Sequence, residues 1–353
     1  MVKIAISEPY IHTNRFKILL FIFLFIFLAP AGGVPVGIDI TDEAGITVSV
    51  PLNPRVVCLS AASAETVYAL NASHLIVGRT ETCTIPPELE KIPSLGSIAG
   101  EVDAESILAT GAGLVISGVP PISAETERSL KSAGIPVLHY NALYVDTILP
   151  MIEDLSLILN REREADELKD FIKRYQNLIN ERIADISSED RPKVYFMSMG
   201  DFYQTAGSDS TGNKRIEMAG GYNIGRNLTG IVPAVDAEWI IDKNPEVIVY
   251  SIRPDQYRAT FPRIEEMAAK RDEIAALPGF DRIDAVKSGR VHVIDIGTLS
   301  GPRGIVGLLY LASWFYPDRF TDVDPAAVHE EMLRDFYHLN WHEPWAYPMS
   351  QSD

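Results

Sequence analysis

The chain has 353 residues, of which 31 are lysine or arginine and 48 are aspartate or glutamate, so its formal net charge is −17. This length is enough for two domains that each bury a hydrophobic core. A strongly acidic surface repels nucleic acid and anionic membranes, so nucleic acid is excluded as a partner. The two cysteines, Cys58 and Cys83, are too few for a disulfide framework, although a single disulfide between them is possible outside the cell.

The N-terminus has the pattern of an export signal. Two basic residues, Arg15 and Lys17, precede an unbroken apolar run at 18–29, which ends in Ala-Pro-Ala-Gly-Gly. We therefore expect residues 1–33 to be a signal peptide that is cleaved after Ala31. The run is shorter than the roughly 20 apolar residues that span a bilayer, but nearby valines extend it and leave a retained N-terminal anchor as the alternative. Because no cysteine lies near the cleavage position, we expect an exported protein, periplasmic or on the outer face of the cytoplasmic membrane, that is not a lipoprotein.

Residues 34–143 are predicted to form a first α/β lobe. A glycine turn within 41–51 predicts a β-hairpin. Short apolar strands then alternate with helices that begin on serine or aspartate, and this alternation implies a parallel sheet covered on both faces. The expected strands are 55–60, 76–78, 114–117 and 137–140, and the expected helices are 63–70, 123–133 and one that begins at Asp103.

A long helical segment at 144–186 follows the first lobe. Its apolar side chains recur every three or four residues from Leu168 to Ile183, so one face should be buried along the whole length. We expect a continuous helix that acts as a rigid spine between two lobes. From Glu162 onward it would be about 35 Å long, at about 1.5 Å per residue.

Alternation of strand and helix resumes in residues 187–339, which predicts a second α/β lobe. The remaining tail, residues 340–353, is rich in aromatic residues and proline and is left unassigned. The expected strands of the second lobe are 194–198, 247–250 and 291–294, and its expected helices are 264–269, 302–315, 324–338 and one that begins at Asp236.

The tetrapeptide Val-Asp-Ala-Glu occurs twice, at 102–105 and at 235–238, and similar apolar residues follow both copies at the same spacing. Each aspartate is suited to cap a helix N-terminus, and each glutamate falls in the first turn, where the helix dipole favours negative charge. Good capping chemistry explains one copy but not the matching residues that follow it. We therefore favour duplication of a structural unit, so that the two halves are built alike.

The sequence contains no recognisable catalytic or metal-binding pattern. It lacks a Gly-x-Ser-x-Gly elbow, a phosphate-binding Gly-Lys loop and a His-Glu-x-x-His pair. His338 and His342 are four residues apart and would hold a metal on a helix, but their position in the tail favours a solvated terminus. We therefore expect no catalytic residue and no metal site.

An open parallel α/β sheet binds ligands in the loops at the carboxyl ends of its strands. In the first lobe this rule selects the loops 60–63, 79–83 and 117–119. In the second lobe it selects the loops 199–207, 250–253 and 295–303, which carry aromatic side chains and arginines. Aromatic faces and fixed positive charges suit a flat or anionic chelate. For Arg303, an ion pair with a carboxylate of a neighbouring loop is the alternative. The expected ligand-binding residues are Cys83, Phe202, Tyr203, Tyr250, Arg253 and Arg303.

Several short motifs occur in a specific order along the chain. They are a Thr-Asp-x-x-Gly hairpin, Arg55-Val56-Val57, Ser63-Ala64-Glu65-Thr66, Pro86-Pro87, Ile92-Pro93-Ser94-Leu95-Gly96, Ala219-Gly220-Gly221-Tyr222-Asn223 and Gly301-Pro302-Arg303. Over roughly residues 41–316 the chain resembles the class III substrate-binding proteins of ABC importers. The resemblance implies an α/β fold of two Rossmann-like lobes with parallel sheets, joined by one long helix, with the ligand in the cleft between them.

The resemblance also implies a function. Proteins of this class deliver ferric siderophores, haem or cobalamin to a permease dimer with its ATPase, and Glu105 and Glu238 match glutamates that pair with arginines of the permease. We expect a monomeric binding protein that captures an iron chelate, has no cofactor of its own and is not an enzyme. The loops 98–100 and 231–233 lack the aromatic residues of cobalamin-binding members, so cobalamin is the alternative ligand. An exported enzyme and a surface receptor on the same scaffold are further alternatives.

Overall fold

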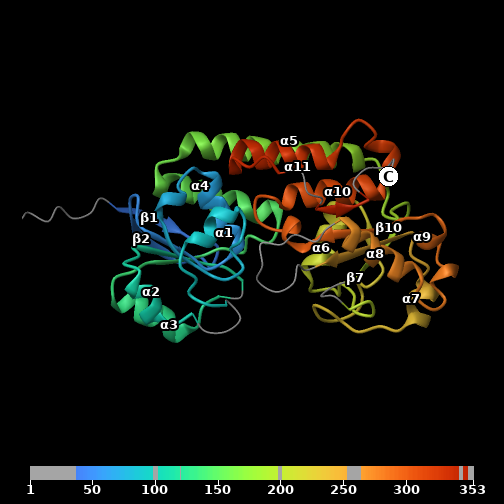
Figure 1. The fold of residues 1–353 in the computed structure, drawn as a ribbon, viewed down its shortest axis with the longest axis horizontal. Coiled ribbons are helices and arrows are strands. Elements are labelled where there is room, and N and C mark those ends of the chain that lie inside the picture. The colour runs from blue at the N-terminus through green and yellow to red at the C-terminus, as the bar shows by residue number, and fades with distance from the viewer. Residues whose placement is uncertain are drawn as a thin grey trace, which may run out of the picture. The chain divides into compact units, whose positions relative to one another are not determined.

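The computed structural model describes residues 37–97, 102–119, 121–197, 201–252, 264–341 and 345–348. The predicted signal peptide, residues 1–33, lies outside these ranges. Within them, no helix is long and apolar enough to cross a membrane. The described residues belong to one unit of the chain, and they form two α/β lobes (Figure 1).

The N-terminal lobe is built on a parallel sheet of four strands, which are β3 (Val56–Cys58), β4 (Ile76–Arg79), β5 (Leu114–Ser117) and β6 (Val137–His139). Their order in the sheet is β4-β3-β5-β6. One face packs against α1 (Ala61–Ala69), and the other packs against α2 (Ala104–Ala109) and α3 (Ala124–Ser132). Two short 3-10 helices, η1 (Ser73–Leu75) and η2 (Pro87–Lys91), lie in its loops.

The predicted hairpin is confirmed. Strand β1 (Gly37–Thr41) pairs with β2 (Thr47–Pro51) in an antiparallel register. Its turn contains Gly45 at φ +75°, a conformation that glycine adopts without steric cost. The Asp42 carboxylate accepts hydrogen bonds from the turn and, at 3.0 Å, from the backbone N–H of His139. The hairpin is thereby fastened to the end of β6.

The C-terminal lobe has five strands, which are β7 (Lys193–Met197), β8 (Tyr222–Asn223), β9 (Val247–Ile252), β10 (Val291–Asp295) and β11 (Ala346–Tyr347). Their order is β11-β10-β9-β7-β8, and β11 alone runs antiparallel to its neighbour. If the first four strands of each lobe are taken in chain order, both sheets read second, first, third, fourth. This shared order agrees with the prediction that the two halves are built alike.

The helices of the C-terminal lobe cover both faces of its sheet. They are α6 (Thr211–Met218), α7 (Ala237–Lys243), α8 (Ile264–Ala275), α9 (Asp284–Lys287), α10 (Gly304–Phe315) and α11 (Pro325–Tyr337). The 3-10 helix η3 (Phe280–Arg282) lies between α8 and α9, η4 (Ile296–Leu299) between β10 and α10, and η5 (Pro317–Arg319) between α10 and α11. Every residue of α10 is buried, which makes it the central helix of this lobe.

The tail that the sequence left unassigned adds β11 to the sheet. Strand β11 pairs with β10, and the preceding Trp345 is 4% exposed. The backbone N–H of Asp295 donates to the carbonyl oxygen of Trp345 at 2.8 Å. A two-residue strand is too short for any periodicity, so only tertiary contacts reveal it.

The prediction of one continuous helix over 144–186 is wrong. The segment forms two helices, α4 (Val145–Leu159) and α5 (Glu162–Ile183), that pack against each other. Asn160 ends α4 in the left-handed conformation at φ 52°, which asparagine tolerates better than most residues, and the chain then reverses direction. The apolar stripe itself is confirmed, because Leu168, Phe171, Ile172, Ile179 and Ile183 are the buried side of α5.

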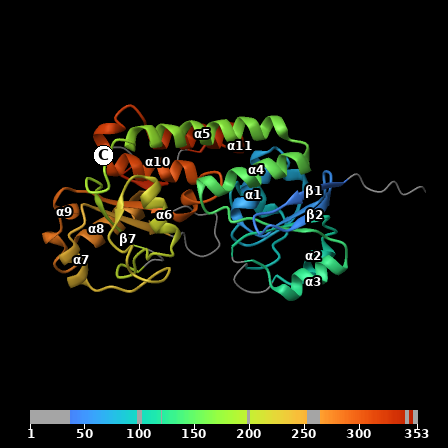
Figure 2. The same cartoon turned by 180° about the vertical axis from the view of Figure 1, so that it is seen from behind.

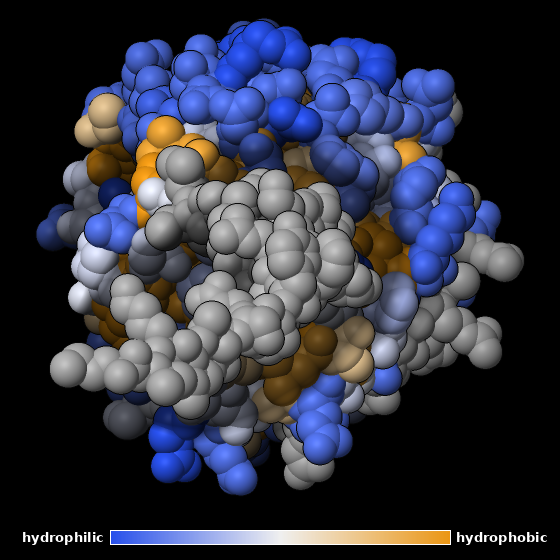
Figure 3. All heavy atoms as spheres, turned by 90° about the vertical axis from the view of Figure 1, so that its left-hand side faces the viewer, coloured by the Kyte–Doolittle hydropathy of each residue, from blue (hydrophilic) through white to orange (hydrophobic). Residues whose placement is uncertain are grey.

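Helix α5 lies alongside α11 in both views of the fold (Figures 1 and 2). Phe171 of α5 contacts Phe336 of α11, with ring centroids 5.5 Å apart. The opposite side of α5 is polar, and hydrophilic residues cover that edge of the molecule (Figure 3). The helix is therefore amphipathic, with its apolar side facing the core.

Among the described residues, the hydrophobic core that connects the lobes lies on the side of α4, α5, α10 and α11. A single cluster of buried residues contains strand residues of both sheets together with α4, α5, α10 and α11. The opposite faces of the two sheets have separate cores, one under α2 and α3 and one under α7 and α8. The lobes cannot separate unless this shared core is disrupted. The packing of α4, α5, α10 and α11 therefore restricts the motion of one lobe relative to the other.

Candidate functional site

The carboxyl end of β9 carries an aromatic cluster. Phe202 and Tyr250 are two of the predicted ligand-binding residues, and their ring centroids are 5.7 Å apart. The Nζ of Lys270 lies 5.1 Å from the Phe202 centroid and 5.8 Å from that of Tyr250, within the range of cation–π attraction. Lys270 also forms an ion pair with Glu273 at 2.6 Å. Sequence reasoning missed Lys270 because nothing distinguishes it from other surface lysines of a helix.

Tyr250 contributes to the core more than to the surface. It is 4% exposed, and burial raises its pKa. Phe202 is half-buried, and its carbonyl oxygen accepts a hydrogen bond of 2.7 Å from the hydroxyl of Tyr195. Phe202 is therefore the more exposed ring of the pair, and it packs against the buried ring of Tyr250.

Tyr203 lies next to the second Val-Asp-Ala-Glu copy. It is half-buried, and its carbonyl oxygen accepts a hydrogen bond of 2.8 Å from the backbone N–H of Val235. In the loop before that copy, Ile231 is 64% exposed, the largest value among the exposed large apolar residues of the described chain. Arg253 and the loop 98–100 lie outside the described residues.

Cys83 is fully buried in the core of the N-terminal lobe, where no ligand would reach it. Its Sγ lies 3.3 Å from the Thr80 hydroxyl and donates to the carbonyl oxygen of Cys58 at 3.8 Å. Both cysteines are free thiols in this structure, and burial raises the pKa of each. The expected ligand role does not fit this environment, because a small sulfur side chain after a strand packs well as an apolar residue.

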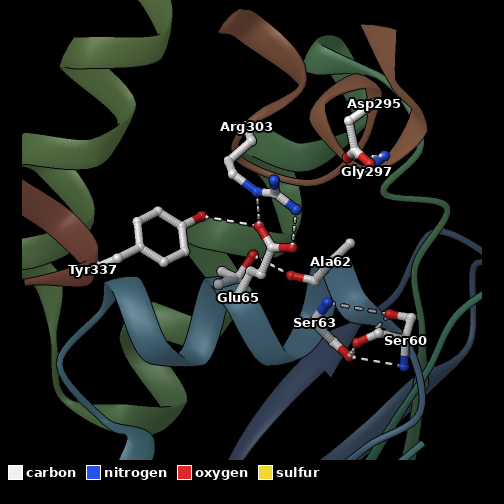
Figure 4. A network of polar contacts seen from close by, with 9 residues as sticks. Ser60, Ala62, Ser63, Glu65, Asp295, Gly297, Arg303 and Tyr337 are labelled. Carbon is white, nitrogen blue, oxygen red and sulfur yellow. Dashed lines mark hydrogen bonds and ion pairs between the residues drawn. The ribbon is translucent and has the colours of Figure 1, made fainter. Parts of the chain in front are cut away.

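Arg303 is also buried, at 2% exposure, and it faces a carboxylate rather than a ligand. Its Nε and Nη2 atoms each donate to the Glu65 carboxylate at 2.8 Å (Figure 4). The Tyr337 hydroxyl donates to the same carboxylate at 3.2 Å, and Trp345 covers the guanidinium at 4.9 Å. The alternative expectation, pairing with a carboxylate, is the one that the structure supports. The partner is on α1 of the other lobe, 238 positions away, rather than on a neighbouring loop.

Asp295 lies beside this ion pair (Figure 4). Its Oδ1 accepts a hydrogen bond of 2.8 Å from the backbone N–H of Gly297, while Oδ2 has no partner among the described residues. Burial raises the pKa of Asp295 to about 6, although the positive charge of Arg303 opposes this shift. The buried network thus contains two carboxylates, Asp295 and Glu65, and one guanidinium.

The two Val-Asp-Ala-Glu copies open α2 and α7, and both predicted caps are confirmed. Asp103 accepts a hydrogen bond from the backbone N–H of Ser106 at 2.7 Å, and Asp236 accepts one from Trp239 at 2.8 Å. Glu105 and Glu238 follow in the first turns and are exposed. Neither forms an ion pair with another described residue. Each lobe therefore presents one free carboxylate at the same point of the repeated unit.

A pocket lies where the start of α4 meets α6 and the start of α10. Its empty volume is about 230 Å³, counting space open to solvent. The lining residues are Leu143, Tyr144, Val145, Arg215, Met218, Leu299, Gly304 and Leu308. Elsewhere in the described ranges, no group of three or more His, Cys, Asp or Glu residues is placed to hold a metal ion.

Comparison of the chain with known proteins identifies a matching family. The family model described as "Periplasmic binding protein" matches residues 56–296. The "Uncharacterized ABC transporter substrate-binding lipoprotein YvrC" of Bacillus subtilis (strain 168) is 30% identical over 295 residues, which are 82% of this chain and 88% of that protein. A cobalamin-binding protein of Halobacterium salinarum is 26% identical over 224 residues, which are 62% of this chain and 60% of that protein.

The fold also matches solved structures. The TroA-like periplasmic binding protein FepB from Veillonella parvula superposes with a TM-score of 0.76 at 22% sequence identity. The match covers 89% of this chain and 100% of that chain. At this level of identity the comparison shows a common fold of two parallel-sheet lobes.

Proposed function

Because the chain belongs to the periplasmic binding protein family and is the substrate-binding component of an ABC importer, we propose that it captures an iron chelate, such as a ferric siderophore or haem. The chelate would bind between the lobes and be delivered to the permease without chemical change, since this is a family of binding proteins and not of enzymes. An aromatic face at Phe202, with Lys270 beside it, suits a flat anionic chelate.

The pair of exposed glutamates is the observation that carries the delivery step. Glu105 and Glu238 occupy the same position in two lobes of the same strand order, and both are free of ion pairs with the described residues. A carboxylate that is exposed in the free protein can accept a bidentate arginine at a modest desolvation cost. We propose that the two glutamates bind arginines of a permease dimer, one glutamate per subunit, so that docking requires both lobes.

Charge reversal tests this docking. Purified protein is added to proteoliposomes that contain the cognate permease and ATPase, and stimulation of ATP hydrolysis is measured. We expect Glu105→Arg with Glu238→Arg to abolish the stimulation. The matched control is Glu125→Arg with Glu265→Arg, which reverses two exposed first-turn glutamates of α3 and α8. Full stimulation by the first double variant would overturn the docking assignment.

Cobalamin is the alternative ligand, and the Halobacterium relative supports it because that protein is named as cobalamin-binding. The exposed Ile231 supplies an apolar but not an aromatic surface in the loop before α7. Absorption spectroscopy and mass spectrometry of the protein purified from its native host separate the candidates. A ferric siderophore, haem and a corrinoid each give a different visible spectrum, and a corrinoid spectrum would overturn the iron-chelate proposal.

The protein acts outside the cytoplasm, as its family does. We propose that the apolar run at 18–29 directs its export and that no lipid is attached, since no cysteine lies near the expected cleavage position. The Bacillus relative is named a lipoprotein, so this chain would be held or released differently. N-terminal sequencing of the mature protein tests the proposal, because a retained Met1 would mean an uncleaved anchor.

A further inference from the structure

A loop of the C-terminal lobe lies directly on α1 of the N-terminal lobe. The loop is Gly301-Pro302-Arg303, one of the short motifs of the sequence. Gly301 has φ +64°, and a Cβ atom at this residue would lie 3.1 Å from the Cα of Ala62. Its backbone N–H donates to the carbonyl oxygen of Ala142 at 3.0 Å. Glycine is required here both by the left-handed backbone and by the close approach of two main chains.

The ion pair between Arg303 and Glu65 adds a directional contact to this close approach (Figure 4). Both side chains are 3% exposed, and two hydrogen bonds of 2.8 Å join them. A bidentate pair fixes the angle between two groups as well as their separation, whereas apolar contacts are non-directional. Rotation of one lobe against the other would break these bonds and leave a buried charge without its partner, which is costly. The pair therefore resists rotation of the lobes.

The C-terminal tail covers this ion pair. The ring centroid of Trp345 lies 4.9 Å from Cζ of Arg303, within the range of cation–π attraction. The same ring lies 4.7 Å from the ring of His329 on α11, and the carbonyl oxygen of Trp345 accepts the hydrogen bond from Asp295. Because the ring shields the guanidinium from water, the hydrogen bonds to Glu65 form in a poorly hydrated environment, where they are strong. Trp345 thus supports the contact between the lobes.

Each side of this contact is connected through a packed core to one of the exposed glutamates. Helix α2, which carries Glu105, shares a core with β3, the strand that leads into α1. Helix α7, which carries Glu238, shares a core with β10, the strand that leads to Arg303. Close-packed cores transmit a displacement with little compression. A rotation at the Arg303–Glu65 pair would therefore change the distance between the two exposed glutamates.

We propose that Glu65, Arg303 and Trp345 are positioning residues that fix the distance between Glu105 and Glu238, and thus the spacing that a permease dimer meets. This inference rests on the proposed function and deepens it, because it names the contact that sets the docking geometry. The three residues are buried and act through the orientation of the lobes rather than by touching the permease.

A distance measurement in the free protein tests this role. Spin labels are attached to Glu105→Cys and Glu238→Cys in the full exported chain, and pulsed electron paramagnetic resonance gives the distribution of distances between them. The native thiols of Cys58 and Cys83 are fully buried, so the labels attach to the two introduced cysteines. We expect one narrow distribution when the interlobe contact is intact.

Three substitutions are then compared in this labelled protein. Arg303→Lys keeps the charge but not the bidentate fork, and Trp345→Ala uncovers the guanidinium. The matched control is Ile274→Ala, which makes a cavity in the separate core of the C-terminal lobe. All three should lower the melting temperature. Only Arg303→Lys and Trp345→Ala should widen the distance distribution or displace its maximum.

The same substitutions are also tested for docking, in protein that keeps both exposed glutamates. Stimulation of ATP hydrolysis is titrated in proteoliposomes that contain the permease and its ATPase. We expect Arg303→Lys and Trp345→Ala to raise the protein concentration for half-maximal stimulation about fivefold or more, as for other conformational couplings. Ile274→Ala should leave this concentration unchanged.

Three results would overturn the inference. They are an unchanged distance distribution in both interlobe variants, an equal change of the distribution in Ile274→Ala, and a changed distribution that leaves the stimulation unaffected. If Arg303→Lys does not fold, Trp345→Ala decides alone. Failure of wild type to stimulate its permease would instead contradict the proposed function, and the distances would still show whether these residues fix the spacing.

Discussion

On the faces away from the shared core, α2 and α7 present Glu105 and Glu238 to solvent, whereas between the lobes Glu65 is buried against Arg303. Glu105 and Glu238 lie in the first turns of their helices and Glu65 lies in the middle of α1, and among the described residues only Glu65 has an ion-pair partner. This difference supports the proposal that Glu105 and Glu238, at matched positions of the two lobes, bind a partner outside the chain. An unmatched pair, by contrast, holds the two lobes together.

Removal of one side of the buried ion pair should give the largest effect on stability. Arg303→Ala leaves the Glu65 carboxylate and the Tyr337 hydroxyl buried together without a counter-charge. We expect a loss of about 3–5 kcal/mol in the free energy of unfolding, as for other broken buried pairs. Urea denaturation followed by tryptophan fluorescence measures it, and a loss below about 1 kcal/mol would contradict the assignment.

Two controls separate the effect of leaving one buried charge unpaired from the effect of losing a charged side chain. The double variant Glu65→Ala with Arg303→Ala should lose less than the sum of the single variants, because no charge is left unpaired. Arg163 and Glu167 form a surface pair on α5, at 74% and 57% side-chain exposure. We expect Arg163→Ala to cost at most about 0.5 kcal/mol, since exposed pairs contribute little.

The second prediction concerns Asp295, the carboxylate of the same buried network that lies beside the Glu65–Arg303 ion pair. Since the pKa of Asp295 is raised to about 6, the folded state holds its proton more tightly than the unfolded chain does. The cost of ionising it is fully present above pH 6 and is relieved as the pH falls from 6 to about 4. Asp295→Asn removes this cost and should stabilise the protein at pH 7.5 by about 1–3 kcal/mol.

The groups that face Asp295 decide whether this prediction holds. They are the Arg303 guanidinium, which favours ionisation, the Glu65 carboxylate, which opposes it, and the backbone N–H groups of Gly297 and Thr298. Thermal melts of wild type and Asp295→Asn between pH 4 and 8 should converge toward acid. Parallel curves across this range would mean that Asp295 does not titrate there.

Sequence reasoning succeeded where the pattern is local. Periodicity revealed the buried stripe of α5, and capping chemistry revealed the starts of α2 and α7. It failed at Asn160, where one left-handed residue divides a helical pattern that is otherwise unbroken. In physical terms, the cost of one such residue is small, and the packing of α4 on α5 outweighs it.

The candidate site was less predictable than the fold. The partner of Arg303 lies 238 positions away, and Lys270 and Arg215 look like ordinary helix residues in the sequence. An ion pair or a buried charge depends on which elements meet in space, and local patterns carry no information about that. Phe202 and Tyr250 were predicted as ligand residues from the general rule that places ligand loops at the carboxyl ends of parallel strands, and in the structure Phe202 follows β7 whereas Tyr250 lies within β9.

The third prediction compares the two repeat copies directly. Asp103 accepts hydrogen bonds from both the backbone N–H and the hydroxyl of Ser106, at 2.7 and 2.9 Å, whereas Asp236 precedes Trp239, which has no hydroxyl to donate. Asp103→Ala and Asp236→Ala should each lower the melting temperature by roughly 1–4 °C, with the larger effect for Asp103. Differential scanning calorimetry measures both, and equal shifts would show that the extra hydrogen bond contributes nothing.

The smallest effect on stability is expected at the glutamates that follow these caps. Glu105→Gln and Glu238→Gln remove an exposed charge that no described residue pairs with, so only a weak interaction with the helix dipole is lost. The free energy of unfolding should change by no more than about 0.5 kcal/mol in either variant, and the two changes should be equal within error. Affinity for the permease, measured on the same samples, should nevertheless fall, and more in the double variant than in either single one. A loss of stability as large as that of the caps would mean that these carboxylates serve the fold, and the contrast with Glu65 would then disappear.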